Sequence, residues 1–242
     1  MIKFENTEVF NFEGAFRGMR NPLNSWELSD SEVCPNSLGF EDCKSAVGKC
    51  PRGDNPSFNE AVFCMGTKDL KLAQKLINAG SDHRKFMRQI FVSVDITSWA
   101  TWWAEFDTYK VATVRNSCSK MHKIHVKAFE RSDFSLEGVD ALTNKTAYPF
   151  NTTLKKHVDD IIETLDILRE LYNKTGDKDY WRALLELLPH SYNMRATVTL
   201  NYETLRNIYF ARRNHKLDEW RVGFMEWIDS LPYADELIKY GG

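Results

Sequence analysis

The sequence lacks a long apolar run. No stretch of its 242 residues reaches the roughly 18–20 apolar residues that a membrane-spanning helix needs. Residues 1–9 are polar and carry acids, so they also lack the apolar centre of a secretion signal. We therefore expect a cytoplasmic protein that has no membrane partner.

Cysteine is scarce, with five residues in the chain. An odd number in a chain without an export signal argues against a disulfide framework. The first four form no Cys-x-x-Cys pair, and their spacing matches no common zinc site. We expect no metal, and reduced, partly buried thiols at Cys34, Cys43, Cys50, Cys64 and Cys118.

An excess of charge of one sign is also absent. The 32 lysines and arginines nearly balance the 34 aspartates and glutamates, which leaves a formal net charge of −2 at pH 7. This balance excludes a global field that would attract a nucleic acid polymer or an anionic membrane, but it permits a local basic site for a phosphate. The length suffices for one large domain or two small ones with a substantial core.

Prolines and glycines interrupt residues 1–66. We predict that these residues form a loop-rich N-terminal extension packed on a core domain of residues 67–242. Within the extension, Arg17 and Arg20 lie close in sequence to Asn24 and Ser25. Such a group would suit a phosphate or a carboxylate, and it equally fits an ordinary surface turn.

Beyond residue 66 the apolar periodicity is mostly helical. It predicts helices at 69–79, 97–109, 154–174, 180–188, 202–213 and 217–230. Alternation predicts a strand at 91–96, and residues 195–200 are expected to be extended. Several long helices with few strands predict an α+β fold.

Two segments combine polar and charged residues with aromatic ones. Residues 113–119 are rich in hydroxyl and amide groups, and Lys110, Arg115 and Lys120 supply positive charge beside them. Such a run can bind a phosphate or a base edge. The same run also fits an ordinary solvated surface.

The second segment spans residues 188–216. In the helix expected from residue 202, Glu203, Arg206 and Asn207 share one side because they are three and four positions apart. Taken alone, this side also fits a solvated helix face with ion pairs.

In register as well as composition, these segments resemble the ThyX (flavin-dependent thymidylate synthase) family. That family carries Arg-His-Arg-x-x-Ser-x-Asn-Glu-x-Ser-x-Arg-Tyr downstream of a histidine in a Glu-His segment. Aligned without a gap, the histidine falls on His83, and the motif falls on Thr108-Tyr109-Lys110, Thr113, Arg115-Asn116, Cys118 and Lys120-Met121. The resemblance covers roughly residues 68–232.

The downstream part of the family pattern fits too. It consists of Leu-Pro, an extended piece that ends in Asn-x-Arg-x-Leu, and a helix that carries an asparagine. These features fall on Leu188-Pro189, Asn201-Tyr202-Glu203-Thr204-Leu205 and Asn207. The family's following Leu-Arg falls on Ala211-Arg212, and Leu217-Asp218 stands where the family carries Ala-Gln.

The resemblance implies a homotetramer of α+β subunits, each with helices packed on a small, mostly antiparallel sheet. It implies sites for FAD and dUMP shared between subunits, with NADPH and methylenetetrahydrofolate as co-substrates for methylation at C5 of uracil. The flavin-binding residues that it implies are His83, Tyr109, Lys110, Thr113, Asn207 and Arg212. The implied nucleotide-binding residues are Asn116, Ser117, Cys118, Ser119, Lys120 and Arg206.

Several signature positions depart from the family. Tyr109 can stack on a flavin ring, and Lys110 keeps a positive charge but loses the planar fork of an arginine. Asn116 replaces a carboxylate with an amide. Cys118 replaces a serine, and we predict Cys118 and Lys110 as catalytic residues because a thiol can attack C6 of a pyrimidine. A cysteine here also fits as a small hydrophobe.

Glu203 stands where the resemblance implies a nucleotide-binding arginine. A carboxylate there would repel a phosphate, unless Arg206 pairs with it or takes over its role. Other candidates for the missing positive charge are Arg20, Arg195 and Arg212.

Polar replacements at many ligand positions indicate a changed substrate more than a decayed site. We predict an FAD-dependent, thymidylate synthase-like enzyme that acts at C5 of a pyrimidine deoxynucleotide such as dUMP. One alternative is a homologue that binds a nucleotide as a sensor or inhibitor, or that modifies a different pyrimidine nucleotide. Another is a purely architectural similarity, with the aromatic segment 99–109 as an assembly interface.

Overall fold

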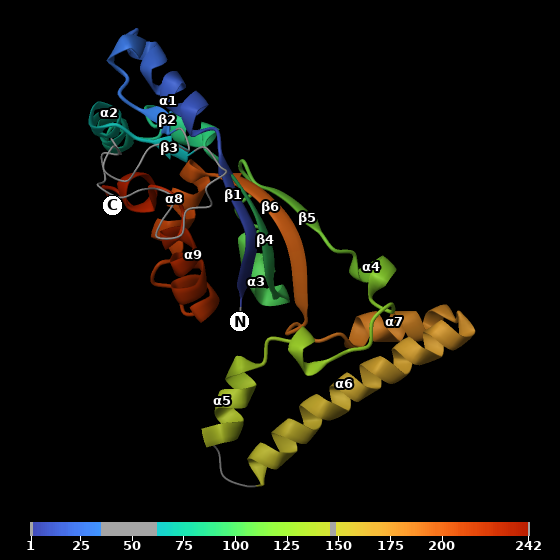
Figure 1. Cartoon of the computed structure of the whole chain (residues 1–242). Coiled ribbons are helices and arrows are strands. Elements are labelled where there is room, and N and C mark those ends of the chain that lie inside the picture. The colour runs from blue at the N-terminus through green and yellow to red at the C-terminus, as the bar shows by residue number, and fades with distance from the viewer. Residues whose placement is uncertain (1, 35–61, 146–148, 242) are drawn as a thin grey trace. The chain divides into compact units, whose positions relative to one another are not determined.

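The computed structural model describes residues 2–34, 62–145 and 149–241, except for the side chain of Lys120 (Figure 1). Within these ranges, no helix has the length and apolar character that crossing a bilayer requires. The chain forms two compact units, which we describe separately. Unit 1 comprises 1–5, 95–108 and 115–197, and unit 2 comprises 6–94, 109–114 and 198–242.

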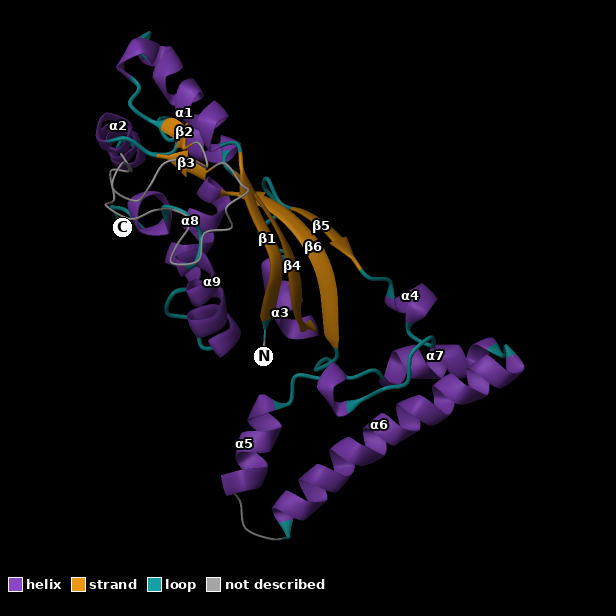
Figure 2. Cartoon of the chain, viewed as in Figure 1, coloured by secondary structure: helices purple, strands orange, loops and turns teal. Residues whose placement is uncertain are grey.

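A four-stranded antiparallel sheet carries the strand order β1-β4-β6-β5 (Figure 2). Its strands are β1 (Lys3–Phe10), β4 (Phe91–Trp99), β5 (Val114–Ser117) and β6 (Asn193–Asn201). Burial alternates along the two inner strands, so Val92, Val94 and Ile96 of β4 lie in the core while their neighbours are partly solvated. This period of two is the pattern of a sheet with one buried face.

Unit 2 contains helices that pack around an aromatic core. Phe12 packs edge-on against Tyr202 and Tyr233 and stacks on Phe63. The helical elements are α1 (Phe12–Arg20), α2 (Thr67–Asn78), η4 (Lys85–Gln89), α8 (Tyr202–Arg212), η6 (Glu219–Phe224), α9 (Met225–Asp229) and η7 (Ala234–Ile238), with short 3-10 turns at Asn21–Leu23 and Trp26–Leu28. A small antiparallel pair joins β2 (Glu32–Cys34) to β3 (Val62–Cys64).

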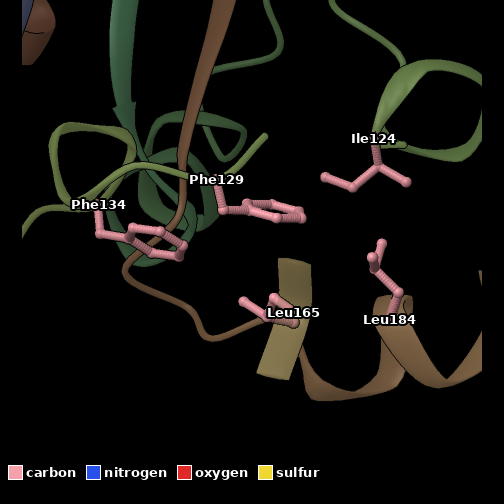
Figure 3. Packing of buried hydrophobic residues seen from close by; sticks show 5 residues of the cluster. All are labelled: Ile124, Phe129, Phe134, Leu165 and Leu184. Carbon is pink, nitrogen blue, oxygen red and sulfur yellow. The ribbon is translucent and has the colours of Figure 1, made fainter. Parts of the chain in front are cut away.

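Unit 1 is mainly helical. Its elements are α3 (Ala100–Phe106), α4 (Lys120–Lys123), η5 (Arg131–Asp133), α5 (Glu137–Lys145), α6 (Phe150–Thr175) and α7 (Lys178–Leu187). The helices α6 and α7 pack against each other, and Gly176 makes the turn between them with a positive φ of 69°. Their apolar faces meet in a cluster of Ile124, Phe129, Phe134, Leu165 and Leu184 (Figure 3).

Most elements predicted from periodicity are confirmed. The helix predicted at 69–79 corresponds to α2, the one at 154–174 lies within α6, and the strand at 91–96 lies within β4. The helix predicted at 97–109 is shorter than expected, because β4 continues to Trp99. The segment predicted as a helix at 217–230 begins with the π-helix η6 before α9. The predicted α+β class is confirmed.

The aromatic segment 99–109 supplies core side chains. Trp102 and Trp103 are fully buried in unit 1 and pack against each other and against Phe106. These three side chains therefore belong to the core and do not line an exposed interface, whereas an interface formed by the rest of segment 99–109 stays a prediction.

Among the described cysteines, Cys34 is half-buried, Cys64 is buried and Cys118 is exposed, while Cys43 and Cys50 lie outside the described residues. The N-terminal segment 1–66 contributes β1, α1, β2 and β3 together with short 3-10 turns, and its residues 35–61 are not described.

Candidate functional site

The signature segment 109–114 is held by helix α8 within unit 2. The Nε atom of Arg212 donates a hydrogen bond to the hydroxyl oxygen of Tyr109 at 2.7 Å. The hydroxyl of Thr204 donates to the backbone carbonyl of Val111 at 3.3 Å. Tyr109 and Val111 are therefore in contact with helix α8, although Tyr109 and Arg212 are 103 residues apart along the chain.

Tyr109 is packed between cationic and aromatic groups. The Arg212 guanidinium lies 5.5 Å from the centroid of the Tyr109 ring and 5.2 Å from that of Trp220. The two rings are themselves 6.3 Å apart and tilted by 60°. These contacts restrict the orientation of Tyr109, as stacking on a planar ligand would require.

The backbone of the same segment is strained at Ala112. This residue adopts a left-handed conformation with φ of 56°. The conformation costs a residue with a Cβ roughly 1–2 kcal/mol. Such outliers persist where the surrounding structure fixes them, and they cluster at functional sites.

Thr113 follows this turn and carries an unpaired hydroxyl. Its Oγ1 atom is buried and, among the described residues, finds no hydrogen-bond partner. Buried hydroxyls in proteins are nearly always paired, so an orphaned one points to a missing ligand or water. Thr113 stands where the resemblance implies a serine that contacts flavin.

The other predicted flavin-binding residues of unit 2 are accessible. Lys110 is exposed beside Val111, of which 85% is exposed. Asn207 is exposed on α8, and His83 is exposed in a turn where its N–H donates to the carbonyl of Gly80 at 3.1 Å. Each can reach a ligand without moving a core side chain.

Glu203 is paired with two arginines and a serine. Its carboxylate accepts hydrogen bonds from Ser81 Oγ at 3.0 Å, from Arg84 Nε at 3.1 Å and from Arg88 Nε. Burial raises the pKa of Glu203, and the hydrogen bonds from Arg88, Ser81 and Arg84 outweigh this effect, so the pKa lies below its usual value. Of the two alternatives open for Arg206, an ion pair with Glu203 does not form among the described residues, where Arg84 and Arg88 are the ion-pair partners of Glu203. Sequence reasoning missed Arg84 and Arg88, although Arg84 directly follows the aligned His83.

Arg206 and Arg20 have structural partners instead. The Arg206 guanidinium is buried and donates to the carbonyl of Ile238 at 3.0 Å and to that of Tyr240. Arg20 is buried in an ion pair with Asp69 at 2.6 Å, so it is not available to replace a charge at a ligand site.

In unit 1, the segment 116–119 is an exposed polar strip. Asn116 and Ser117 end strand β5, and the N–H of Cys118 donates to the carbonyl of Arg195 at 3.0 Å while its side chain is exposed. Ser119 Oγ accepts the N–H of His122 at 3.2 Å. This strip presents an amide, two hydroxyls and a thiol to solvent.

Two cations of unit 1 that were predicted to face a ligand are paired within the protein. Nη1 of Arg115 donates to both carboxylate oxygens of Asp107, at 2.8 and 2.7 Å, and the guanidinium carbon lies 3.9 Å from the centroid of the Trp103 ring. Arg195 pairs with Asp95 at 2.8 Å.

Of the twelve predicted site residues, seven lie in unit 2 and five, Asn116 to Lys120, lie in unit 1. Within the described ranges, no group of histidine, cysteine, aspartate and glutamate side chains could hold a metal ion.

The fold resembles solved structures of thymidylate synthase X (ThyX). Two crystal structures of ThyX from Helicobacter pylori, both with FAD and dUMP, superpose with TM-scores of 0.59 at 15% sequence identity. The match covers 99% of this chain and 96% and 97% of theirs. No protein-family model and no curated protein matches the chain. The fold is thus ThyX-like, as predicted.

Proposed function

We propose that this protein is an FAD-dependent, thymidylate synthase-like enzyme that acts at C5 of a pyrimidine deoxynucleotide such as dUMP. The observation that carries the proposal is the packing of segment 109–114 on α8, within a fold that resembles ThyX structures with FAD and dUMP. We further propose a cytoplasmic homotetramer, with NADPH and methylenetetrahydrofolate as co-substrates.

The described residues of unit 2 fit a flavin. The orphaned hydroxyl of Thr113 needs a partner, the oriented ring of Tyr109 offers a stacking surface, and Lys110 offers an unburied positive charge. We assign His83, Asn207 and Arg212 to the same cofactor. When bound and reduced, the flavin supplies the hydride.

The residues of unit 1 are assigned to the nucleotide. Asn116 offers both a donor and an acceptor to a base edge, and the hydroxyls of Ser117 and Ser119 suit polar groups of the sugar or phosphate. The exposed thiol of Cys118 is the proposed nucleophile toward C6 of the base. Lys120 is assigned to the phosphate by alignment.

The test is to identify the small molecules that the purified protein carries. We expect a yellow protein that releases FAD on denaturation, identified by mass spectrometry. Thr113→Val removes the hydroxyl while keeping the shape, and it should weaken FAD binding by about tenfold, because one hydrogen bond inside a buried site is lost. Thr152→Val, on an exposed part of α6, is the matched control and should bind FAD normally. Colourless protein that cannot be loaded with FAD would overturn the proposal.

One observation favours a second candidate, a nucleotide-binding sensor or inhibitor without flavin. Tyr109 and Arg212, both assigned to flavin, already bind each other. Thermal shifts with dUMP, dCMP and their triphosphates, measured without FAD, separate the two functions, since a ligand that binds the native state raises the melting temperature. Stabilisation by nucleotide in a protein that never binds FAD would select the sensor.

A further inference from the structure

The turn that carries His83 is fixed to helix α8 by one carboxylate. Glu203, of which 8% of the side chain is exposed, binds Arg84 and Arg88 and the hydroxyl of Ser81. Arg88 also donates to the carbonyl and the hydroxyl of Ser81 at 3.2 and 2.9 Å, which closes the turn on itself. The network therefore holds both arginines of the turn in defined positions.

The two arginines differ in how many of their donors are used. Arg88 is 45% exposed, uses Nε and Nη2 within the network, and has Asp82 as a second nearby negative charge. Arg84 is only 18% exposed and uses Nε alone. Within the described part of the chain, its Nη1 and Nη2 atoms make no hydrogen bond, and they are not among the buried unpaired atoms, so solvent reaches them.

Positive charge is in excess around Arg84. Glu203 is shared between two guanidinium groups. The pKa of Arg206 is lowered by burial and by the positive charge of Arg84, which shows that these two guanidinium groups lie near each other. An anion at the terminal nitrogens of Arg84 would relieve this repulsion and use a fork that matches phosphate geometry.

Resting on the proposed function, we infer that Arg84 is a phosphate-binding residue, held in place by Glu203, and that it replaces the arginine that the resemblance implies at position 203. The sequence also offers Arg206 and Arg20 for this role, but Arg206 donates to the backbone carbonyls of Ile238 and Tyr240, and Arg20 is paired with Asp69. The phosphate belongs either to the dinucleotide cofactor or to the nucleotide substrate, and both present the same chemistry to a guanidinium.

The experiment measures anion binding by the full-length protein. Inorganic pyrophosphate is titrated against intrinsic tryptophan fluorescence and against the melting temperature, with potassium chloride at matched ionic strength as the blank. We expect Arg84→Gln to weaken pyrophosphate binding by about tenfold or more, because charged hydrogen bonds are lost. Arg84→Lys keeps the positive charge but lacks the planar guanidinium, so its affinity for pyrophosphate should lie between those of the wild type and Arg84→Gln. Arg182→Gln removes an exposed arginine paired with Glu186, and it should bind as the wild type does.

Parallel titrations identify the source of the phosphate. If FAD loses affinity in Arg84→Gln while riboflavin does not, the residue binds the cofactor. If dUMP loses affinity while deoxyuridine does not, it binds the substrate. A merely structural role would weaken the ligands without phosphate equally.

The outcomes separate this inference from the proposed function. Pyrophosphate binding that depends on Arg84, in a protein that binds neither FAD nor dUMP, supports the inference and overturns the function. FAD or dUMP binding that is unchanged in both Arg84 variants overturns the inference and leaves the function standing. Wild-type protein that binds none of the three ligands overturns both. If Arg84→Gln is unfolded by circular dichroism, the Arg84→Lys result decides.

Discussion

Asp69 and Glu203, both in unit 2, each accept hydrogen bonds from arginine and serine side chains, but the arginine bound to Asp69 is buried and those bound to Glu203 reach solvent. Asp69, at the start of α2, is completely buried and accepts hydrogen bonds from Arg20 Nε at 2.6 Å and from Ser29 Oγ at 2.7 Å. It also accepts the N–H groups of Asp30 and Ser31. Nη1 of Arg20 in turn donates hydrogen bonds to the backbone carbonyl and the hydroxyl of Ser25. Nearly every donor of this network has a partner.

The network of Glu203 is open. Glu203 binds two arginines, whereas Asp69 binds one, and both of these arginines reach solvent and keep N–H groups that make no hydrogen bond within the described residues. The difference teaches a way to separate roles. A charged network that satisfies its own donors stabilises the fold, whereas a network that leaves donors of a fixed guanidinium open to solvent can also bind an anion there.

The largest effect is expected from Asp69→Asn. Removing this charge leaves Arg20 buried without a counter-ion, which costs about 3–5 kcal/mol in the free energy of unfolding. Urea denaturation followed by circular dichroism measures it. Asp160→Asn, on the exposed face of α6, is the control and should leave the denaturation midpoint unchanged. An Asp69→Asn midpoint equal to that of the wild type would show that the closed network is not structural.

A pH series sharpens the same comparison. Burial raises the pKa of Asp69, but the hydrogen bonds from Ser31, Ser29 and Arg20 and the charge of Arg20 outweigh it, so the folded pKa lies below the usual value. A lowered folded pKa means that this stabilisation is complete above the unfolded pKa of about 3.9 and is lost as pH falls through the folded pKa. The gap in stability between wild type and Asp69→Asn should therefore be wide at neutral pH, begin to shrink once pH falls below about 4, and close as pH passes the lowered folded pKa. A gap that stays constant through acid pH would contradict the assignment.

The smallest effect is expected from Glu203→Gln. Because Arg84 and Arg88 both reach solvent, water can replace some of the hydrogen bonds that the carboxylate accepts from them. The free energy of unfolding should therefore fall by about 1–2 kcal/mol. The same urea series measures it, with Glu186→Gln on the surface of α7 as a control without effect. A loss as large as that of Asp69→Asn would place the Glu203 network with the structural one.

The sequence predicted the elements that bury a periodic face. Leu70, Ala73 and Ile77 mark α2, and Gly80 marks its end. It did not predict β1, whose residues are mostly exposed, so no alternation distinguishes this strand from a loop. Helix α1 was missed although Phe12, Phe16 and Met19 share a face, because Gly14 and Gly18 within it suggest turns.

The candidate site was predictable only in part. The resemblance assigned Tyr109 and Arg212 to one cofactor, and in the structure these two side chains are hydrogen-bonded to each other. The partners of Glu203 were not predictable, since Arg88 is 115 residues away and no local pattern selects it over Arg206. Long-range pairing of charges depends on which turn the fold brings against a helix, and periodicity does not contain that information.

The left-handed turn at Ala112 determines which side chains position 112 accepts. Glycine adopts this backbone at no steric cost, and asparagine or aspartate tolerate it, whereas valine or isoleucine would force the chain out of it. The neighbouring hydroxyl of Thr113 would then lose its buried position. A library that varies position 112 would thus report on the backbone conformation of that residue, and through it on the placement of the Thr113 hydroxyl.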